Sequence, residues 1–311
     1  MNFPPLTQVL AFDDEQVTGR ALAAALQLPL ALIERHRFPD GELKLRLPAR
    51  LSGSVVLLRG LHQPNEKLVE LLISAPTARE LGAERLLLAC PYLAYMRQDI
   101  EFTPGEAVSQ RHIAGLLGHT FDAVITIDPH LHRISRLDEV MPNCHAVALS
   151  AAGLLGRWIV QQAERRGEAG RLLLLGPDEE SGQWVRNAAQ AATADGHPTP
   201  QHAWCLKQRH GDHDVAVALP PELDLAGRAV VLIDDMASTG RTLMAAAQLC
   251  LAGGAASVDV AVTHALFVGD ALERLQAAGI RQIWSTDCVP HASNALSVVP
   301  LLAEALRAVP V

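Results

Sequence analysis

The chain is short of positive charge, of paired cysteines and of long apolar runs, and each shortage excludes a class of protein. Its 311 residues carry 26 Lys and Arg against 34 Asp and Glu, a formal net charge of −8, which argues against a general binder of nucleic acid or of membrane surfaces. The five cysteines include no C-x-x-C pair, a pattern typical of reduced thiols in a cytoplasmic protein. No apolar stretch approaches the roughly 18 residues that span a bilayer, and no secretory signal is recognisable.

Short apolar runs alternate instead with longer helical patterns, and hydrophobic residues make up 49% of the sequence. The predicted strands are Val55–Leu58, Arg85–Cys90, Ala123–Ile127, Leu172–Leu175, Ala229–Ile233, Ser257–Val262 and Gln282–Trp284. The predicted helices are Glu66–Leu81, Ser109–Leu117, Ala151–Arg165, Thr242–Ala252 and Asp270–Ala278. Continuous apolar strands separated by helices are typical of parallel strands covered on both faces, so we predict an α/β fold.

One strand–helix–strand pattern occurs twice. SGSVVLLRG, a helix and ELGAERLLLACPYL in the first half resemble AGRAVVLIDD, a helix and LAGGAASVDVAVTHALF in the second. We therefore expect two similar domains, residues 1–146 and 147–311, with the last helix able to pack back on the first domain. The alternative, that all such units look alike, stays open.

The strongest local signal is VVLIDDMASTGRTL at residues 230 to 243. A strand ends in two acids, a loop of small residues follows, and a helix begins near Arg241-Thr242, so backbone N–H groups and the positive end of the helix dipole meet at one point. Such a loop suits a phosphate, while the two carboxylates can accept hydrogen bonds from ribose hydroxyls. An ordinary capped helix is the weaker alternative. The residues predicted to hold ribose 5-phosphate are Asp234, Asp235, Ala237, Ser238, Thr239, Gly240, Arg241 and Thr242.

This loop resembles the phosphoribosyl-diphosphate motif of type I phosphoribosyltransferases and of ribose-phosphate diphosphokinases. Further segments resemble the diphosphokinases: FPDGE (38–42), PYLAYMRQDIEFTPGE (91–106), ITIDPHLH (125–132), LLGPDEESGQWV (174–185) and CLKQRH (205–210). They follow the family order across nearly the whole chain, whereas simple phosphoribosyltransferases lack the N-terminal set. The chain is identified as a divergent member of the diphosphokinase family. The resemblance implies two similar phosphoribosyltransferase-type domains, each a mainly parallel sheet flanked by helices.

The resemblance also implies a role for each matched residue. The implied ATP contacts are Phe38, Asp40, Glu42, Arg97, Gln98, Asp99 and His132. His130 and Asp178 would hold Mg²⁺ or its waters; a zinc site at His130 and His132 has too few ligands. Lys207 and Arg209 would be catalytic, on a segment (Lys207–Asp214) predicted as an exposed, mobile lid. In the family the Phe38 segment reaches a neighbouring subunit, which implies a homo-oligomer, at least a dimer and with a tetramer or hexamer open.

The expected reaction is transfer of a diphosphate group from ATP to O1 of ribose 5-phosphate, with AMP as the other product. Two alternatives stay open: a phosphoribosyltransferase that consumes the activated sugar, and a non-catalytic regulatory homologue. Simpler interpretations also remain for single residues, namely Phe38 in the core, Arg97 as an unpaired surface residue, and Lys207 with Arg209 as a solvated pair. The chain departs from the family pattern at Ile100, Glu101, Arg133, Glu180, Ser181 and Trp184. These changes bear on activation by phosphate, inhibition by ADP, and the choice of donor and acceptor.

Overall fold

The computed structural model describes residues 4–194, 198–209 and 215–310, with the backbone alone at 194, 207–209, 215 and 216. The chain divides into two compact units. Unit 1 consists of Met1–Leu149 and Val298–Val311, and unit 2 of Ser150–Ser297. Each unit contains its own sheet, so each is a separate folded core.

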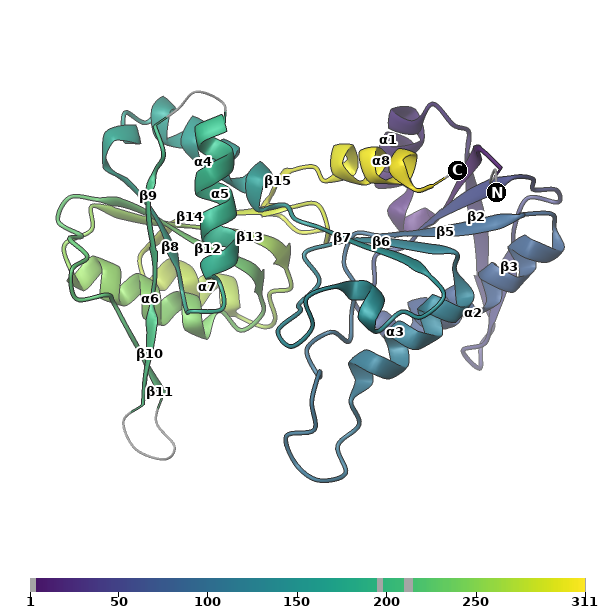
Figure 1. Ribbon diagram of the computed structural model, residues 1–311, viewed down its shortest axis with the longest axis horizontal. Helices are drawn as coiled ribbons and strands as arrows, with labels where there is room; N and C mark the ends of the chain where they lie inside the picture. Colours follow the sequence, from purple (N-terminus) through teal and green to yellow (C-terminus); the bar gives the residue numbers. More distant parts are fainter. Residues whose placement is uncertain (1–3, 195–197, 210–214, 311) are drawn as a thin grey trace. The chain divides into compact units, whose positions relative to one another are not determined.

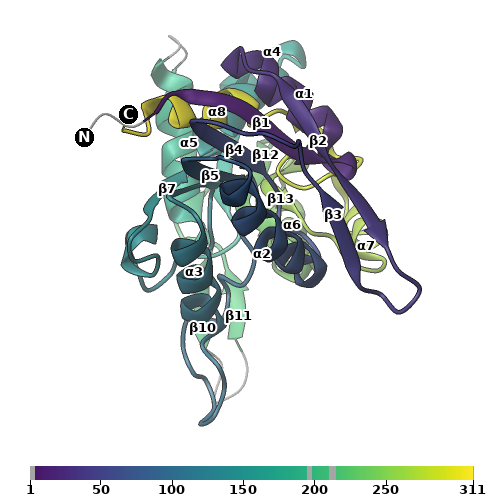
Figure 2. The same cartoon turned by 90° about the vertical axis from the view of Figure 1, so that its right-hand side faces the viewer.

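Unit 1 is built on a seven-stranded sheet with the order β3-β2-β1-β4-β5-β6-β7 (Figures 1 and 2). The strands are β1 (Leu6–Phe12), β2 (Leu30–Arg37), β3 (Leu43–Arg46), β4 (Ser54–Leu58), β5 (Arg85–Cys90), β6 (Ala123–Ile127) and β7 (His145–Leu149). Only β2 and β3 pair antiparallel; the other pairs are parallel. The central strands β4 and β6 are buried throughout, as their unbroken apolar sequences require.

Helices cover both faces of this sheet (Figure 1). They are α1 (Gln16–Leu26), α2 (Pro64–Glu80), α3 (Ser109–Thr120) and α8 (Val299–Ala308), with short 3-10 helices at Asp13–Glu15 and Leu137–Glu139. Helices α1 and α8 pack against each other, as do α2 and α3. The last helix therefore belongs to unit 1, and the carbonyl of Pro310 accepts a hydrogen bond from Arg85 of β5 at 3.0 Å.

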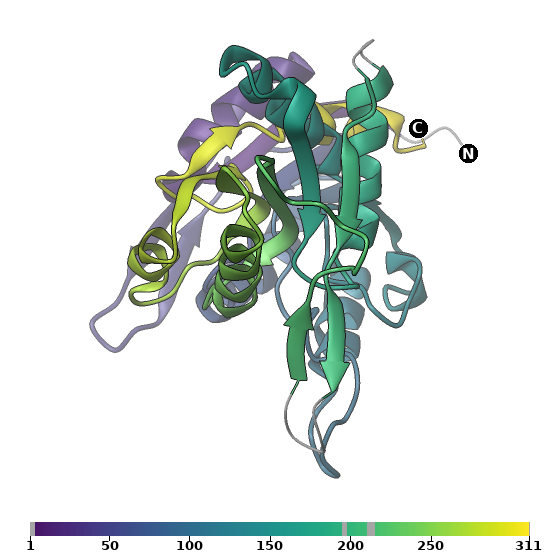
Figure 3. The same cartoon turned by 90° about the vertical axis from the view of Figure 1, so that its left-hand side faces the viewer.

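Unit 2 is built on a six-stranded, entirely parallel sheet with the order β15-β14-β13-β12-β8-β9 (Figure 3). The strands are β8 (Leu172–Gly176), β9 (Gln201–Trp204), β12 (Ala229–Ala237), β13 (Ser257–Ala265), β14 (Ile280–Thr286) and β15 (Asn294–Leu296). The helices are α4 (Ala152–Arg165), α5 (Gly182–Ala194), α6 (Arg241–Ala252) and α7 (Ala271–Ala277), with a 3-10 helix at Ala169–Arg171. One apolar core lies between the sheet and α4 with α5, and a second lies against α6.

The two sheets match strand for strand. Parallel strands β2-β1-β4-β5-β6-β7 in unit 1 correspond to β9-β8-β12-β13-β14-β15 in unit 2. In both, the chain adds a strand on one side and then crosses to the other, so β1 with β4 and β8 with β12 flank a topological switch point, where ligands of such sheets usually bind. The predicted α/β fold with two similar, mainly parallel sheets is confirmed.

A separate antiparallel ribbon carries the predicted lid. Strands β10 (Leu206–Arg209) and β11 (Val215–Ala218) pair with each other and project beyond the six-stranded sheet (Figure 3). The prediction of a loop over Lys207–Asp214 was wrong for Lys207–Arg209, which are strand because their backbones pair with the alternating Val-Ala-Val-Ala run of β11. Residues 210–214 of that prediction lie outside the described residues.

Candidate functional site

The loop predicted to bind phosphate lies at the carboxyl edge of the sheet in unit 2. The prediction that the strand ends at Asp234-Asp235 was wrong: β12 continues to Ala237, because that residue still pairs with Ala265 of β13. Helix α6 begins at Arg241, as predicted. Only Ser238, Thr239 and Gly240 therefore connect strand and helix, so the turn is tight.

Gly240 makes this tight turn feasible. It adopts φ of 70° immediately before α6, a left-handed conformation that favours glycine, and an added Cβ would lie 3.1 Å from the side chain of Leu275. The first turn of α6 contains no acidic residue, and Thr239, Arg241 and Thr242 are exposed. The N–H groups at the start of this helix therefore face a region suited to an anion.

Three carboxylates gather beside this loop. Asp235 is buried, with 2% of its surface exposed. Burial raises the pKa of Asp234 well above its usual range, and the negative charges of Asp235 and Asp178 raise it further. Asp178 lies near because β8, which ends two residues before it at Gly176, pairs with β12. These acids form a concentration of negative charge that repels a bare phosphate and suits hydroxyl groups or a cation.

The segment predicted to contact adenine is the tip of the β2–β3 hairpin. The amide of Phe38 donates to the carbonyl of Glu42 at 2.8 Å, and the amide of Gly41 donates to the carbonyl of Phe38 at 2.9 Å. Asp40 and Glu42 are exposed, and Phe38 is 39% exposed with its ring edge-on to His36. The alternative that Phe38 is a core residue is therefore wrong. The hairpin presents an aromatic ring and two carboxylates to solvent.

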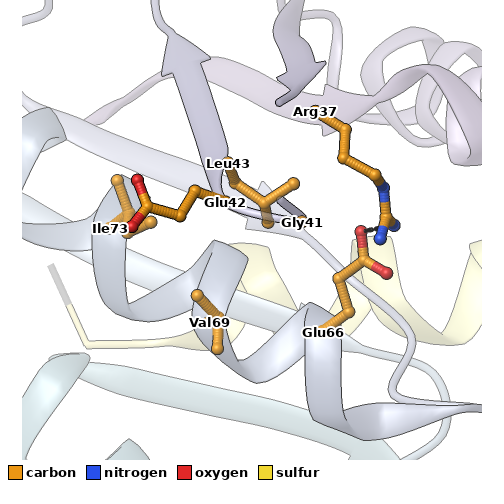
Figure 4. A pocket seen from close by; sticks show the side chains of 7 residues that line it. All are labelled: Arg37, Gly41, Glu42, Leu43, Glu66, Val69 and Ile73. Carbon is orange, nitrogen blue, oxygen red and sulfur yellow. Dashed lines mark hydrogen bonds and ion pairs between the residues drawn. The ribbon is translucent and has the colours of Figure 1, made fainter. Parts of the chain in front are cut away.

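A groove of about 460 Å³ lies between this hairpin and α2 (Figure 4). Its lining residues are Arg37, Gly41, Glu42, Leu43, Glu66, Val69 and Ile73. An ion pair between Arg37 and Glu66 lies at one side, and Val69 is 46% exposed. The predicted adenine segment thus borders a partly apolar hollow of unit 1.

Arg97, Gln98 and Asp99 lie on the long loop between β5 and α3. The Gln98 amide donates to the carbonyl of Ile100 at 2.9 Å and to Glu106 Oε2 at 3.2 Å. Glu106 also accepts from the amides of Phe102 and Thr103, and these bonds, that of Thr103 foremost, lower the pKa of its carboxyl group. The Glu106 carboxylate therefore organises the loop between β5 and α3, a role that the sequence analysis missed.

Asp99 is 6% exposed, and its Oδ2 lies 3.5 Å from Nε of Arg133. Arg133 stands on the loop that follows β6, close to His130 and His132. The rings of those two histidines lie edge to face with centroids 3.9 Å apart. Arg133, at which the chain departs from the family pattern, therefore links two of the predicted ATP-binding segments within unit 1: its own loop after β6 and the loop that carries Asp99.

Lys207 and Arg209 occupy alternate positions of β10, opposite Val217 and Val215. Alternate residues of a strand project to the same side, so the backbone places both on one face of the ribbon. Their side chains lie outside the described part of the structure.

The predicted metal ligands are divided between the units, His130 in unit 1 and Asp178 in unit 2. Among the described residues, no three His, Cys, Asp or Glu side chains are grouped so that they could hold a metal ion. Asp178 is a half-exposed carboxylate at the end of a strand, which is the donor type that Mg²⁺ takes while keeping waters and substrate oxygens. In the described part of the chain, no helix is both long and apolar enough to cross a membrane.

Comparison with known proteins covers both units. Residues 7–120 match the N-terminal domain of ribose phosphate pyrophosphokinase, and residues 214–309 match the phosphoribosyl synthetase-associated domain. The ribose-phosphate pyrophosphokinase of Methanopyrus kandleri is 38% identical over 96% of this chain and 98% of its own length, and that of Methanosarcina acetivorans is 34% identical over 94% and 96%. The crystal structure of phosphoribosylpyrophosphate synthetase from Mycobacterium smegmatis superposes with a TM-score of 0.79 at 25% identity, covering 99% of both chains. The chain therefore belongs to the ribose-phosphate pyrophosphokinase family.

Proposed function

We propose that this chain transfers the diphosphate group of ATP to O1 of ribose 5-phosphate, giving 5-phosphoribosyl 1-diphosphate and AMP. The observation that carries the proposal is the β12–α6 turn, in which two carboxylates precede a helix start closed by Gly240. A phosphate at the helix start and a ribose beside the acids account for both halves of this turn. Full-length relatives named for this activity support the same conclusion.

The sugar is held from both ends. Backbone N–H groups from Ser238 to Thr242, with the hydroxyl groups of Ser238 and Thr242, bind the 5-phosphate. Asp234 and Asp235 accept hydrogen bonds from the ribose hydroxyls. The O1 hydroxyl group then attacks the β-phosphorus of ATP and releases its proton to solvent. A bond from O1 to that phosphorus forms, the bond to the oxygen bridging the α- and β-phosphates breaks, and AMP leaves.

ATP binds to segments that we assign from the family pattern. Phe38 stacks on adenine while Asp40 and Glu42 read its polar edge, with the hairpin supplied by a neighbouring copy of the chain; the working form is therefore a homo-oligomer. The remaining ATP contacts are Arg97, Gln98, Asp99 and His132. The exposure of the hairpin tip supports this assignment.

Positive charge must be supplied to the reacting phosphates, since the chain itself carries a net charge of −8. His130 and Asp178 would hold Mg²⁺, which when bound neutralises phosphate oxygens. Lys207 and Arg209 on the β10–β11 ribbon approach the same phosphates and offset the charge that develops during transfer. Positioning and charge neutralisation are the main tasks of the protein in such a reaction.

We assign the protein to the cytoplasm, where thiols stay reduced, because all five cysteines are free.

We also assign the cysteines no part in catalysis. Burial, as the main cause, raises the pKa of Cys144, Cys205 and Cys250 to about 12 and that of Cys90 still further. These thiols stay protonated near neutral pH and are poor nucleophiles.

The test combines purified protein with ATP, Mg²⁺ and ribose 5-phosphate and identifies the products by ³¹P NMR. AMP and a 1-diphosphorylated pentose support the proposal. Formation of ADP, or no turnover, overturns it. Release of diphosphate from phosphoribosyl diphosphate only with an added nucleobase would identify a phosphoribosyltransferase instead. A Lys207→Ala variant should lose roughly 10²–10³ in kcat, while Arg50→Ala, at an exposed position, should match the unaltered protein.

A further inference from the structure

Asp178 and Ser181 are joined by three hydrogen bonds within one turn of unit 2. The Ser181 amide donates to Asp178 Oδ1 at 3.1 Å, and the Ser181 hydroxyl donates to the Asp178 carbonyl at 2.6 Å. The Asp178 amide in turn lies 3.3 Å from the Ser181 oxygen. Both the backbone and the carboxylate of Asp178 are therefore tied to one serine.

Ser181 is closely surrounded by other residues. It has no exposed surface, and a Cβ on Gly176 would lie 2.2 Å from the serine hydroxyl oxygen, so the serine occupies space that only glycine leaves open. The next residue, Gly182, lies against the indole of Trp204, since an added Cβ would approach that ring to 3.1 Å. The turn is thus wedged between the end of β8 and β9.

The turn belongs to the same edge of the sheet as residues 234–242, which we call the sugar-phosphate loop. Asp178 lies two residues beyond Gly176, the last residue of β8, and β8 pairs with β12, the strand that carries Asp234. Neighbouring carboxylates repel one another, so an unrestrained Asp178 would turn away from Asp234 towards solvent. A hydrogen-bonded turn keeps it in place.

We infer that Ser181 is a positioning residue that fixes the carboxylate of Asp178 beside the sugar-phosphate loop and so prepares it to bind a divalent cation. The inference rests on the proposed function, which gives Asp178 its role as a ligand. Ser181 is one of the positions at which the chain departs from the expected family pattern. Partners that orient a metal-binding side chain typically contribute tenfold or more to affinity.

The test compares Ser181→Ala with Thr193→Ala in the full-length protein. The first variant removes both bonds made by the serine oxygen and keeps the amide bond to Oδ1. The second removes a hydroxyl group from the opposite end of α5, where it bonds to the Ala189 carbonyl at 3.0 Å. Mn²⁺ binding is followed by electron paramagnetic resonance in the presence of α,β-methylene-ATP, alongside kcat, the KM for ribose 5-phosphate, and the melting temperature.

For Ser181→Ala we expect Mn²⁺ affinity and kcat at limiting metal to fall about tenfold, the KM for ribose 5-phosphate to change less than about twofold, and excess Mn²⁺ to restore kcat. Thr193→Ala should leave all three unchanged. Unaltered Mn²⁺ affinity in Ser181→Ala, or a loss of kcat that excess metal does not restore, overturns the inference. Absence of Mn²⁺ binding by the unaltered protein also overturns it. The proposed function is judged separately, by whether the unaltered protein forms AMP. If Ser181→Ala does not fold, Ser181→Gly removes the same two bonds and replaces it.

Discussion

Arg59 and Asp234 occupy equivalent positions in the two sheets. Arg59 directly follows the five residues of β4, and Asp234 directly follows the first five residues of β12, 229–233. Each stands beside the topological switch point of its unit. Unit 2 has acids there, next to a helix start that suits a phosphate. Unit 1 has the cation Arg59 at the same place, and ion pairs with neighbouring acids occupy the space around it.

The Arg59 side chain is fully buried and is surrounded by acids from two other segments. Its guanidinium pairs with Glu70, with Asp14 at 2.7 Å and with Glu15 at 3.2 Å, and it lies over the ring of Phe12 at 4.4 Å. These groups fill the edge of unit 1 that corresponds to the sugar-phosphate loop. The proposed chemistry therefore has one sugar-phosphate site in each chain, in unit 2.

Replacing Arg59 by Met should lower the free energy of unfolding by about 3–5 kcal/mol, because buried carboxylates lose the cation that compensates them. Chemical denaturation measures the change. A second replacement, Glu70→Gln, should restore part of the loss, since it removes one uncompensated charge. Arg46→Met is the matched control: Arg46 pairs with Glu34 on the surface, and the melting temperature should not change. Equal behaviour of the two arginine variants would contradict the role of burial.

Gly240→Ala tests the tight turn before α6. The added methyl group meets both a left-handed backbone and the Leu275 side chain, so we expect a loss of about 2 kcal/mol of stability and weaker binding of ribose 5-phosphate. Gly227→Ala is the control, because Gly227 has φ of 69° and open space around it. That variant should lose about 1 kcal/mol and bind the sugar normally, as calorimetry can show. Equal sugar affinity in both variants would remove Gly240 from the site.

Much of the fold followed from the sequence because its central strands are continuously apolar and separated by helices. The start of α6 was equally readable, since a Gly followed by Arg and Thr ends a run of small residues. The elements outside the central sheets were harder to predict. The β10–β11 ribbon pairs a strand of polar sequence, Lys207–Arg209, with an alternating Val-Ala-Val-Ala run. Pairing with a partner strand, which local sequence does not encode, decided its conformation.

The candidate site was readable where one short segment carries all the groups, as in residues 234–242. It was not readable where the partners come from distant segments. Arg59 and Asp14 are 45 residues apart, and nothing near Arg59 in the sequence indicates that it is buried. Ser181 and Asp178 are close in sequence, but their bonds depend on a turn that Gly176 and Trp204 confine. Packing fixes such contacts, and packing requires the fold.

Asp234→Asn should stabilise the protein at alkaline pH while it weakens the site. Burial and two neighbouring acids raise the pKa of Asp234, so the folded state retains a proton that the unfolded state releases. Stability is therefore lost as the pH rises from the pKa that Asp234 has in the unfolded chain towards the higher pKa that it has in the folded chain. At about pH 8 the amide variant should gain roughly 1–3 kcal/mol and bind ribose 5-phosphate more weakly. The exposed Glu222→Gln should change neither property. A loss of stability in Asp234→Asn at this pH would contradict the raised pKa.

His62→Gln should make the stability of the protein less sensitive to acid. Burial, and then the charges of Lys67 and Arg59, lower the pKa of His62 from 6.5 to about 4, so the folded state keeps this ring neutral while the unfolded state protonates it. Stability falls as pH decreases through that interval, because the unfolded state binds the extra proton.

Denaturation curves taken between about pH 8 and pH 4 should therefore show His62→Gln losing roughly 1–2 kcal/mol less than the unaltered protein, because solvent reaches the partly exposed ring and weakens the full effect. His145→Gln, a change at an exposed position, is the control and should follow the unaltered protein across the whole range. Parallel curves for His62→Gln and the unaltered protein would show that His62 titrates alike in the folded and unfolded chain, and would exclude its burial beside Lys67 as a source of acid sensitivity.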